Sequence, residues 1–151
     1  MWGTLYNLLR EGVEWHLAAE CDLAINNIKK ILASDEVLVH YDPNHPMILA
    51  CDASPLGVGA VLSYTVDGVE RPVAYASCFL TRAEKNYSQI VLEALAIVFG
   101  VTKFNKFLYG RKFTLLTNHE ALTVILGPKK GIPSLAAVRL QRWALILMVF
   151  L

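Results

Sequence analysis

The sequence predicts a mixed-sheet α/β or α+β domain in which a three-strand meander precedes a long helix and a fourth strand. Three observations support this fold class. β-rich segments separated by turn signals fill residues 47–77, an apolar stripe with helical spacing fills residues 90–104, and a further β-rich segment spans residues 112–117. A chain of 151 residues is long enough for one domain with a hydrophobic core.

The meander is predicted from alternating strand and turn signals. We expect strands at Met47–Cys51, Val58–Thr65 and Arg71–Ser77, with Asp67-Gly68 as a two-residue hairpin turn. Gly57 and Gly59 flank the start of the second strand, where we expect the backbone to pass close to another group.

The long helix is predicted to begin after a capping box, Thr81-Arg-Ala-Glu84, to pause near Tyr87-Ser88 and to run on to Phe107. Its apolar positions recur at steps of three and four residues: Ile90, Ala94, Ile97, Val101 and Phe104. Glu93 falls on or beside this stripe, where a surface glutamate is unusual.

Flanking segments complete the predicted organisation. Residues 18–33 have the spacing of an amphipathic helix, and we place a boundary near Ser34, so that residues 1–34 form a tether to an upstream segment and residues 35–151 form the domain. Helix signals return at residues 120–126 and from residue 134 to the end, on either side of a loop that carries Lys129 and Lys130.

Composition restricts the function classes. Apolar residues make up 55% of the chain and mean hydropathy is +0.42, which suggests a piece of a larger protein with faces that neighbours cover or that favour self-association. The net charge of +1 excludes a general basic surface, so any nucleic-acid site is local. Three unclustered cysteines and the lack of a signal sequence predict an intracellular protein of the cytoplasm or nucleus, and the apolar C-terminal run is too short to span a membrane.

Three polar residues are candidates for one site. Asp52 ends the first strand, Glu93 lies on the long helix and Asn118 ends the fourth strand, so all three can meet at one sheet edge. Clustered carboxylates repel unless cations neutralise them, and Mg²⁺ prefers oxygen ligands. The alternative for Asp52 is that it caps the Ala-Ser-Pro turn.

Several motifs, in order, resemble the ribonuclease H domain of gypsy-type LTR retrotransposon polyproteins. They are Cys51–Leu62 (CDASPLGVGAVL), Arg71–Ser77, Glu84–Ile90, Glu93–Ile97, Tyr109–Thr114 and Arg139–Trp143. The resemblance implies a ribonuclease H-like mixed sheet with packed helices, truncated before the family's last strand and helix. It also implies cleavage of the RNA strand of RNA–DNA hybrids with Mg²⁺ or Mn²⁺, and an upstream reverse-transcriptase polymerase domain joined through residues 1–34.

Carried over by position, Asp52 and Glu93 match the family's first two metal-ligating acids. The third acid belongs where Asn118 stands, in Thr117-Asn118-His119, and the chain ends before the fourth. Because an amide oxygen brings no charge, we expect weak metal binding and weak or absent cleavage.

The remaining assignments have competing interpretations. Asn118 can instead belong to a capping box, Thr117-x-x-Glu120. Lys129, Lys130, Arg139 and Arg142 are candidate nucleic-acid contacts or ordinary surface charges. For the whole chain, the alternatives are a co-opted protein- or hybrid-binding module without catalysis and a fragment with no cellular role.

Overall fold

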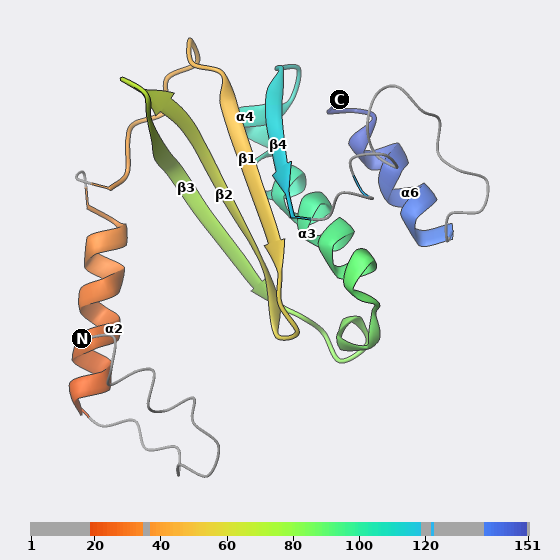
Figure 1. Ribbon diagram of the computed structural model, residues 1–151, viewed down its shortest axis with the longest axis horizontal. Helices are drawn as coiled ribbons and strands as arrows, with labels where there is room; N and C mark the ends of the chain where they lie inside the picture. The colour runs from red at the N-terminus through yellow and green to blue at the C-terminus, as the bar shows by residue number, and fades with distance from the viewer. Residues whose placement is uncertain (1–18, 35–36, 119–121, 123–137, 151) are drawn as a thin grey trace. The chain divides into compact units, whose positions relative to one another are not determined.

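A four-stranded mixed sheet lies at the centre of the unit formed by His40–Leu151 (Figure 1). Strands β1 (Met47–Ala53), β2 (Gly57–Val66) and β3 (Val69–Phe79) form an antiparallel meander, and β4 (Phe113–Thr117) pairs in parallel with β1, giving the order β3-β2-β1-β4. The computed structural model describes residues 19–34, 37–118, 122 and 138–150. The predicted mixed sheet is confirmed.

The first unit, Met1–Val39, is described here by its helix α2, Ala19–Leu32. The helix matches the amphipathic pattern at residues 18–33, and Cys21 and Ala24 are its buried side chains. The unit boundary follows Val39, five residues after the boundary expected at Ser34. The tether role of this segment stays a prediction.

Different physical reasons explain the residues found at the hairpin turn and at the start of β2. Asp67 (φ 50°) and Gly68 (φ 78°) both adopt positive φ, as the predicted two-residue hairpin requires. A Cβ on Gly57 would lie 2.7 Å from the carbonyl oxygen of Cys78, so only glycine allows β3 to approach there. The same expectation is wrong for Gly59, because a Cβ there would meet nothing within 4 Å.

The predicted long helix is three shorter pieces. The Thr81 amide and hydroxyl both donate to Glu84 Oε2 at 2.7 Å, and the Glu84 amide donates to Thr81 Oγ1 at 3.3 Å, which confirms the capping box. This box opens a 3-10 turn, η1 (Glu84–Asn86), rather than the long helix itself. Helix α3 (Gln89–Lys103) and helix α4 (Asn105–Leu108) follow, separated at Phe104.

The core lies between α3 and the sheet. Helix α3 packs on β1 and β2, and its predicted stripe is buried at Ala94, Ile97, Val101 and Phe104, with Ile90 half-buried. Gly100 allows a close approach, since a Cβ there would lie 2.7 Å from Cys51 Sγ and 3.2 Å from Ala60 Cβ. This contact fixes how near the helix lies to the first strand.

Helix α6 (Val138–Leu147) packs against α3 with Leu140, Ala144 and Leu147 buried. Its other faces carry exposed apolar side chains, among them Leu145, Ile146 and Met148. Leu115 and Phe150 are half-buried, so they too present part of their apolar surface. Of the helix expected at residues 120–126, Leu122 alone is described, and it is helical and buried. None of the described helices is long and apolar enough to cross a membrane.

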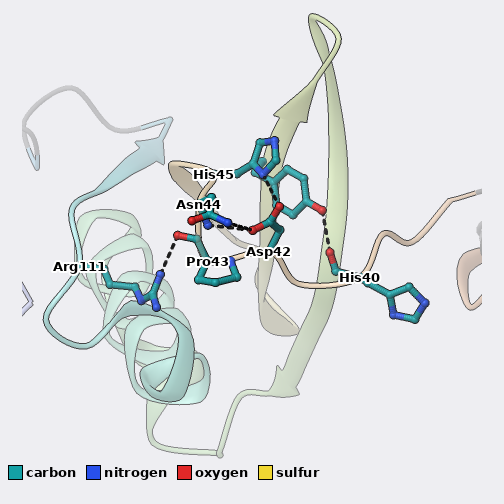
Figure 2. A network of polar contacts seen from close by, with 7 residues as sticks. His40, Asp42, Pro43, Asn44, His45 and Arg111 are labelled. Atoms are coloured by element: carbon teal, nitrogen blue, oxygen red, sulfur yellow. Dashed lines mark hydrogen bonds and ion pairs between the residues drawn. The ribbon is translucent and has the colours of Figure 1, made fainter.

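Figure 2 shows how the segment before β1 is anchored. The Tyr64 hydroxyl donates to the His40 carbonyl oxygen at 2.6 Å, and the His45 ring stacks on Tyr64 with centroids 4.6 Å apart. Arg111 donates to the Pro43 carbonyl oxygen at 2.9 Å. These contacts tie the start of the domain both to β2 and to the segment that precedes β4.

Asp42 organises the tip of this anchor. Its Oδ1 accepts the Asn44 amide at 2.9 Å, and its Oδ2 lies 3.1 Å from His45 Nδ1. The backbone N–H of Asn44, and to a smaller degree the charge of His45, lower the pKa of the Asp42 carboxyl. Both contacts favour the ionised form of an exposed side chain, so the anchor is strongest above the acidic range.

Candidate active site

Parallel pairing of β1 and β4 brings two of the predicted site residues together. Cys51 and Thr117 are partners in the register, so Asp52 and Asn118 are the next residues along the two strands. Asn118 Nδ2 donates to Asp52 Oδ1 at 3.5 Å, a long hydrogen bond, and both side chains are exposed. An acid and an amide therefore share the sheet end at which a cation would bind.

The alternative role for Asp52, capping the turn after β1, is wrong. Ser54 performs that role: its hydroxyl donates to the Gly57 carbonyl oxygen at 3.0 Å and accepts the Gly57 amide at 3.1 Å. Within the described part of the chain, the hydrogen-bond partner of the Asp52 carboxylate is Asn118. The Asp52 carboxylate is thus not used to stabilise the local turn.

Glu93 is buried, with 5% of its surface exposed. Gln89, one helical turn earlier, donates through Nε2 to Glu93 Oε1 at 2.8 Å. The other oxygen, Oε2, is buried and has no hydrogen-bond partner among the described residues. A buried carboxylate oxygen is costly without a compensating partner, so Oε2 is an oxygen with capacity to accept a ligand.

Electrostatics connects Glu93 with the end of β1. Burial raises the pKa of the Cys51 thiol to about 12, and the negative charge of Glu93 adds to this shift. Cys51 directly precedes Asp52, so the field of Glu93 acts on the strand end that carries the first acid. The meeting of Asp52, Glu93 and Asn118 around one ion stays a prediction.

As a predicted donor set, Asp52, Glu93 and Asn118 would suit one hard divalent cation better than two. The unpaired oxygen of Glu93 and the exposed carboxylate of Asp52 are suitable oxygen ligands. Asn118 adds no negative charge, and its N–H group faces Asp52. In the part of the chain that the structure describes, no group of three or more His, Cys, Asp or Glu side chains could hold a metal. A second ion would lack the charge needed to neutralise it.

A hollow of about 380 Å³ adjoins Asp52. Gly57, Gly59 and Ser77 line it, and Phe79 stands at its edge with 86% of its surface exposed. Gly59 is the register partner of Asp52, so the missing side chain leaves the space beside the carboxylate open. The sequence interpretation of the two glycines was a close approach of the backbone, so this hollow was not predicted, and no pattern indicated Phe79.

The predicted nucleic-acid residues fall into two groups. Arg139 and Arg142 are exposed on α6, and the Arg139 guanidinium carbon lies 4.0 Å from the centre of the Tyr87 ring. Lys129 and Lys130 lie outside the described residues, as do His119 and Glu120 of the alternative capping box. Sequence reasoning missed Tyr87, because a tyrosine between two helices gives no periodic signal.

Comparisons with known proteins agree with this architecture. Residues 42–150 match the model of the RNase H-like domain found in reverse transcriptase. The chain is 36% identical over 121 residues to the retrovirus-related Pol polyprotein from transposon opus of Drosophila melanogaster, which covers 80% of this chain and 12% of the relative. It is 36% identical over 149 residues to the transposon Tf2-3 polyprotein of Schizosaccharomyces pombe, covering 97% and 11%.

Solved structures show the same fold. The foamy viral protease-reverse transcriptase dRH in complex with double-stranded DNA superposes with a TM-score of 0.64 at 20% identity, over 96% of this chain and 27% of that one. The foamy viral enzyme in complex with an RNA/DNA hybrid gives a TM-score of 0.52 at 20% identity, over 96% and 20%. This chain spans about one tenth of the length of the two transposon polyproteins. Matched over most of its length by the domain model and by these polyproteins, the chain belongs to the family of RNase H-like domains found in reverse transcriptases.

Proposed function

We propose that this chain is the ribonuclease H-like part of a retrotransposon Pol polyprotein and that its sheet edge is a weakened site for metal-dependent cleavage of RNA in RNA–DNA hybrids. The observation that carries the proposal is the Asn118 amide beside the Asp52 carboxylate, at the position where the family resemblance places an acid. The foamy viral relative binds an RNA/DNA hybrid, which supports the same substrate class here.

Asp52 and Glu93 would hold the ion, Mg²⁺ or Mn²⁺. When bound, such an ion activates a water and stabilises the leaving oxygen of a phosphodiester. Glu93 contributes a carboxylate whose Oε1 is held by Gln89 and whose Oε2 is left without a partner in the described structure. Asp52 contributes a carboxylate that is exposed at the end of β1.

Asn118 weakens this arrangement through charge. Mg²⁺ dehydrates reluctantly and binds weakly through neutral oxygens, so an amide holds it less well than a carboxylate. Loss of one charged ligand from a two-ion site costs several kcal/mol of transition-state stabilisation, on the order of a thousandfold in rate. The proposed activity of the chain is therefore low.

The test is cleavage of a labelled RNA–DNA hybrid in Mg²⁺ and in Mn²⁺. We expect the unmodified chain to cut slowly or not at all. An Asn118→Asp chain extended by a family-type C-terminal strand and Asp-bearing helix should cut in a metal-dependent manner, and Asp52→Asn in that background should abolish cutting. Rapid cleavage by the unmodified chain that disappears in Glu93→Gln would contradict the proposed weakness.

A second candidate function is a protein- or hybrid-binding module without catalysis. The exposed apolar residues of α6, with Leu145 at 60% and Met148 at 67% exposure, favour a covered surface. The polymerase part of the polyprotein or a second copy of the chain would be the partner. Sedimentation at tens of micromolar tests whether the partner is a second copy of the chain. A monomer at that concentration would exclude self-association and leave the polymerase part as the partner.

A further inference from the structure

A groove of about 650 Å³ lies on α6 next to the segment that precedes α3. Its lining combines aromatic, apolar and basic side chains: Tyr87, Val138, Arg139, Arg142, Trp143, Leu145 and Ile146. The Arg139 guanidinium carbon lies 4.0 Å from the centroid of the Tyr87 ring, within cation–π distance. We call this feature the Arg139 groove.

The described residues that line the Arg139 groove carry charge of one sign. They include two arginines and no carboxylate, and no salt bridge to either arginine occurs within residues 37–118 and 138–150. Stacking uses the face of a guanidinium and leaves its N–H edge free, so the Tyr87 ring holds Arg139 in a fixed position with its donors available. Two guanidinium groups beside an aromatic surface suit phosphate oxygens.

The Arg139 groove lies at the end of α3 that carries the candidate active site. Tyr87 is two residues before Gln89, the first residue of α3, and Gln89 hydrogen-bonds Glu93. A separation of six residues, mostly helical, is on the order of 10 Å along the chain. A nucleic-acid strand positioned at Glu93 therefore reaches the groove within a few nucleotides.

We infer that the Arg139 groove binds the sugar–phosphate backbone of an RNA–DNA hybrid next to the cleavage site, with Arg139 and Arg142 as phosphate contacts. The inference rests on the proposed substrate and adds a binding subsite to it. Two observations favour a hybrid over a protein partner. The two arginines complement the negative charge of phosphates, and the groove lies next to the candidate active site. Apolar contact with a protein would not by itself require two arginines without an acidic residue among the described residues of the lining.

The test is binding of a fluorescent RNA–DNA hybrid of about 18 base pairs to the full chain, measured by anisotropy in EDTA across a salt series. The Arg139→Ala/Arg142→Ala variant should bind roughly tenfold more weakly at 0.1 M salt, and the slope of log K against log salt should fall by about two. The matched control is Lys103→Ala/Lys106→Ala, which removes the same charge at the last residue of α3 and on α4 and should change affinity little.

Substitutions of Tyr87 test the groove independently of the two arginines. Tyr87→Phe keeps the ring and should bind the hybrid as the unmodified chain does. Tyr87→Ala frees Arg139 and should weaken binding about two- to fivefold, the worth of an exposed cation–π contact. If the double-alanine variant does not fold by circular dichroism, the Arg139→Gln/Arg142→Gln pair provides the same comparison.

Three results would overturn the inference: no hybrid binding by the unmodified chain, equal losses in the arginine and lysine pairs, or arginine dependence only with a DNA duplex. A groove that binds protein instead would appear as an Ile146→Glu variant that dissociates a self-associated form while hybrid affinity stays constant. Because binding is measured without metal, it is independent of the cleavage assay. Loss of arginine dependence contradicts the groove, whereas failure of the extended Asn118→Asp chain to cut a hybrid in Mg²⁺ or Mn²⁺ contradicts the proposed function.

Discussion

Gly100→Ala tests whether the close approach of α3 to β1 is built on a missing side chain. The added Cβ would lie 2.7 Å from Cys51 Sγ, whereas non-bonded carbon contacts are favourable at about 3.5–4.0 Å, so either the buried thiol must rotate or helix and strand must separate. Overpacking of this kind costs about 1–3 kcal/mol, and the higher helix propensity of alanine returns about 1 kcal/mol. We expect a net loss of about 1 kcal/mol in the free energy of unfolding.

Urea unfolding of four chains measures this effect: the unmodified chain, Gly100→Ala, Cys51→Ala and the double variant. Without the sulfur, the shortest contact is gone and the Ala60 Cβ at 3.2 Å remains, so Gly100→Ala should cost less than in the unmodified chain, with a coupling energy of about 1–2 kcal/mol. Thr102→Ala, at an exposed position of the same helix, controls for propensity and should stabilise slightly. Equal stabilisation by Gly100→Ala in both Cys51 backgrounds would refute the close-packing argument.

Three further predictions concern the fold. Tyr64→Phe removes the 2.6 Å hydrogen bond that anchors the segment before β1 and should lower stability by about 1 kcal/mol in urea unfolding; an unchanged midpoint would contradict the anchor. Gly57→Ala should destabilise by about 1–3 kcal/mol because its Cβ meets a carbonyl oxygen, whereas Gly59→Ala, which meets nothing, should not. The pKa of Cys51 is raised to about 12 from an ordinary 9.0, so the unfolded thiol ionises first and stability should fall by about 1.4 kcal/mol per pH unit within that window. That extra slope should be absent in Cys51→Ala, and an identical slope in both proteins would argue against a buried neutral thiol.

Local signals predicted the strands well. The apolar run at Met47, the Asp67-Gly68 turn and the Thr81 capping box each depend on a few neighbouring residues, and the structure has all three. The break at Phe104 was missed because helical periodicity continues across it, with Phe107 half-buried and Leu108 buried on the next turn. Tertiary packing, rather than a sequence signal, decides that interruption.

The candidate site was predicted in part. A glutamate on an apolar stripe identified Glu93, since burial of an acid has few structural explanations. Asp52 and Asn118 are 66 residues apart in the sequence, and their contact depends on the parallel pairing of β1 and β4. Only the order of the motifs suggested that pairing. Gly100 and Tyr87 escaped prediction because their roles consist of contacts with residues distant in sequence, Cys51 and Arg139.

We propose above all that the missing charge at Asn118 weakens the metal site. This proposal is tested by the Mn²⁺ affinity of the purified chain, followed by electron paramagnetic resonance of the free ion. Asn118→Asp should tighten binding at least about tenfold, because an added carboxylate near a divalent ion contributes more than about 1.4 kcal/mol even in a partly solvated site. Asp52→Asn in the Asn118→Asp background should reverse that gain. Equal Mn²⁺ affinity in the unmodified chain and in Asn118→Asp would contradict the proposal that Asn118 weakens the metal site.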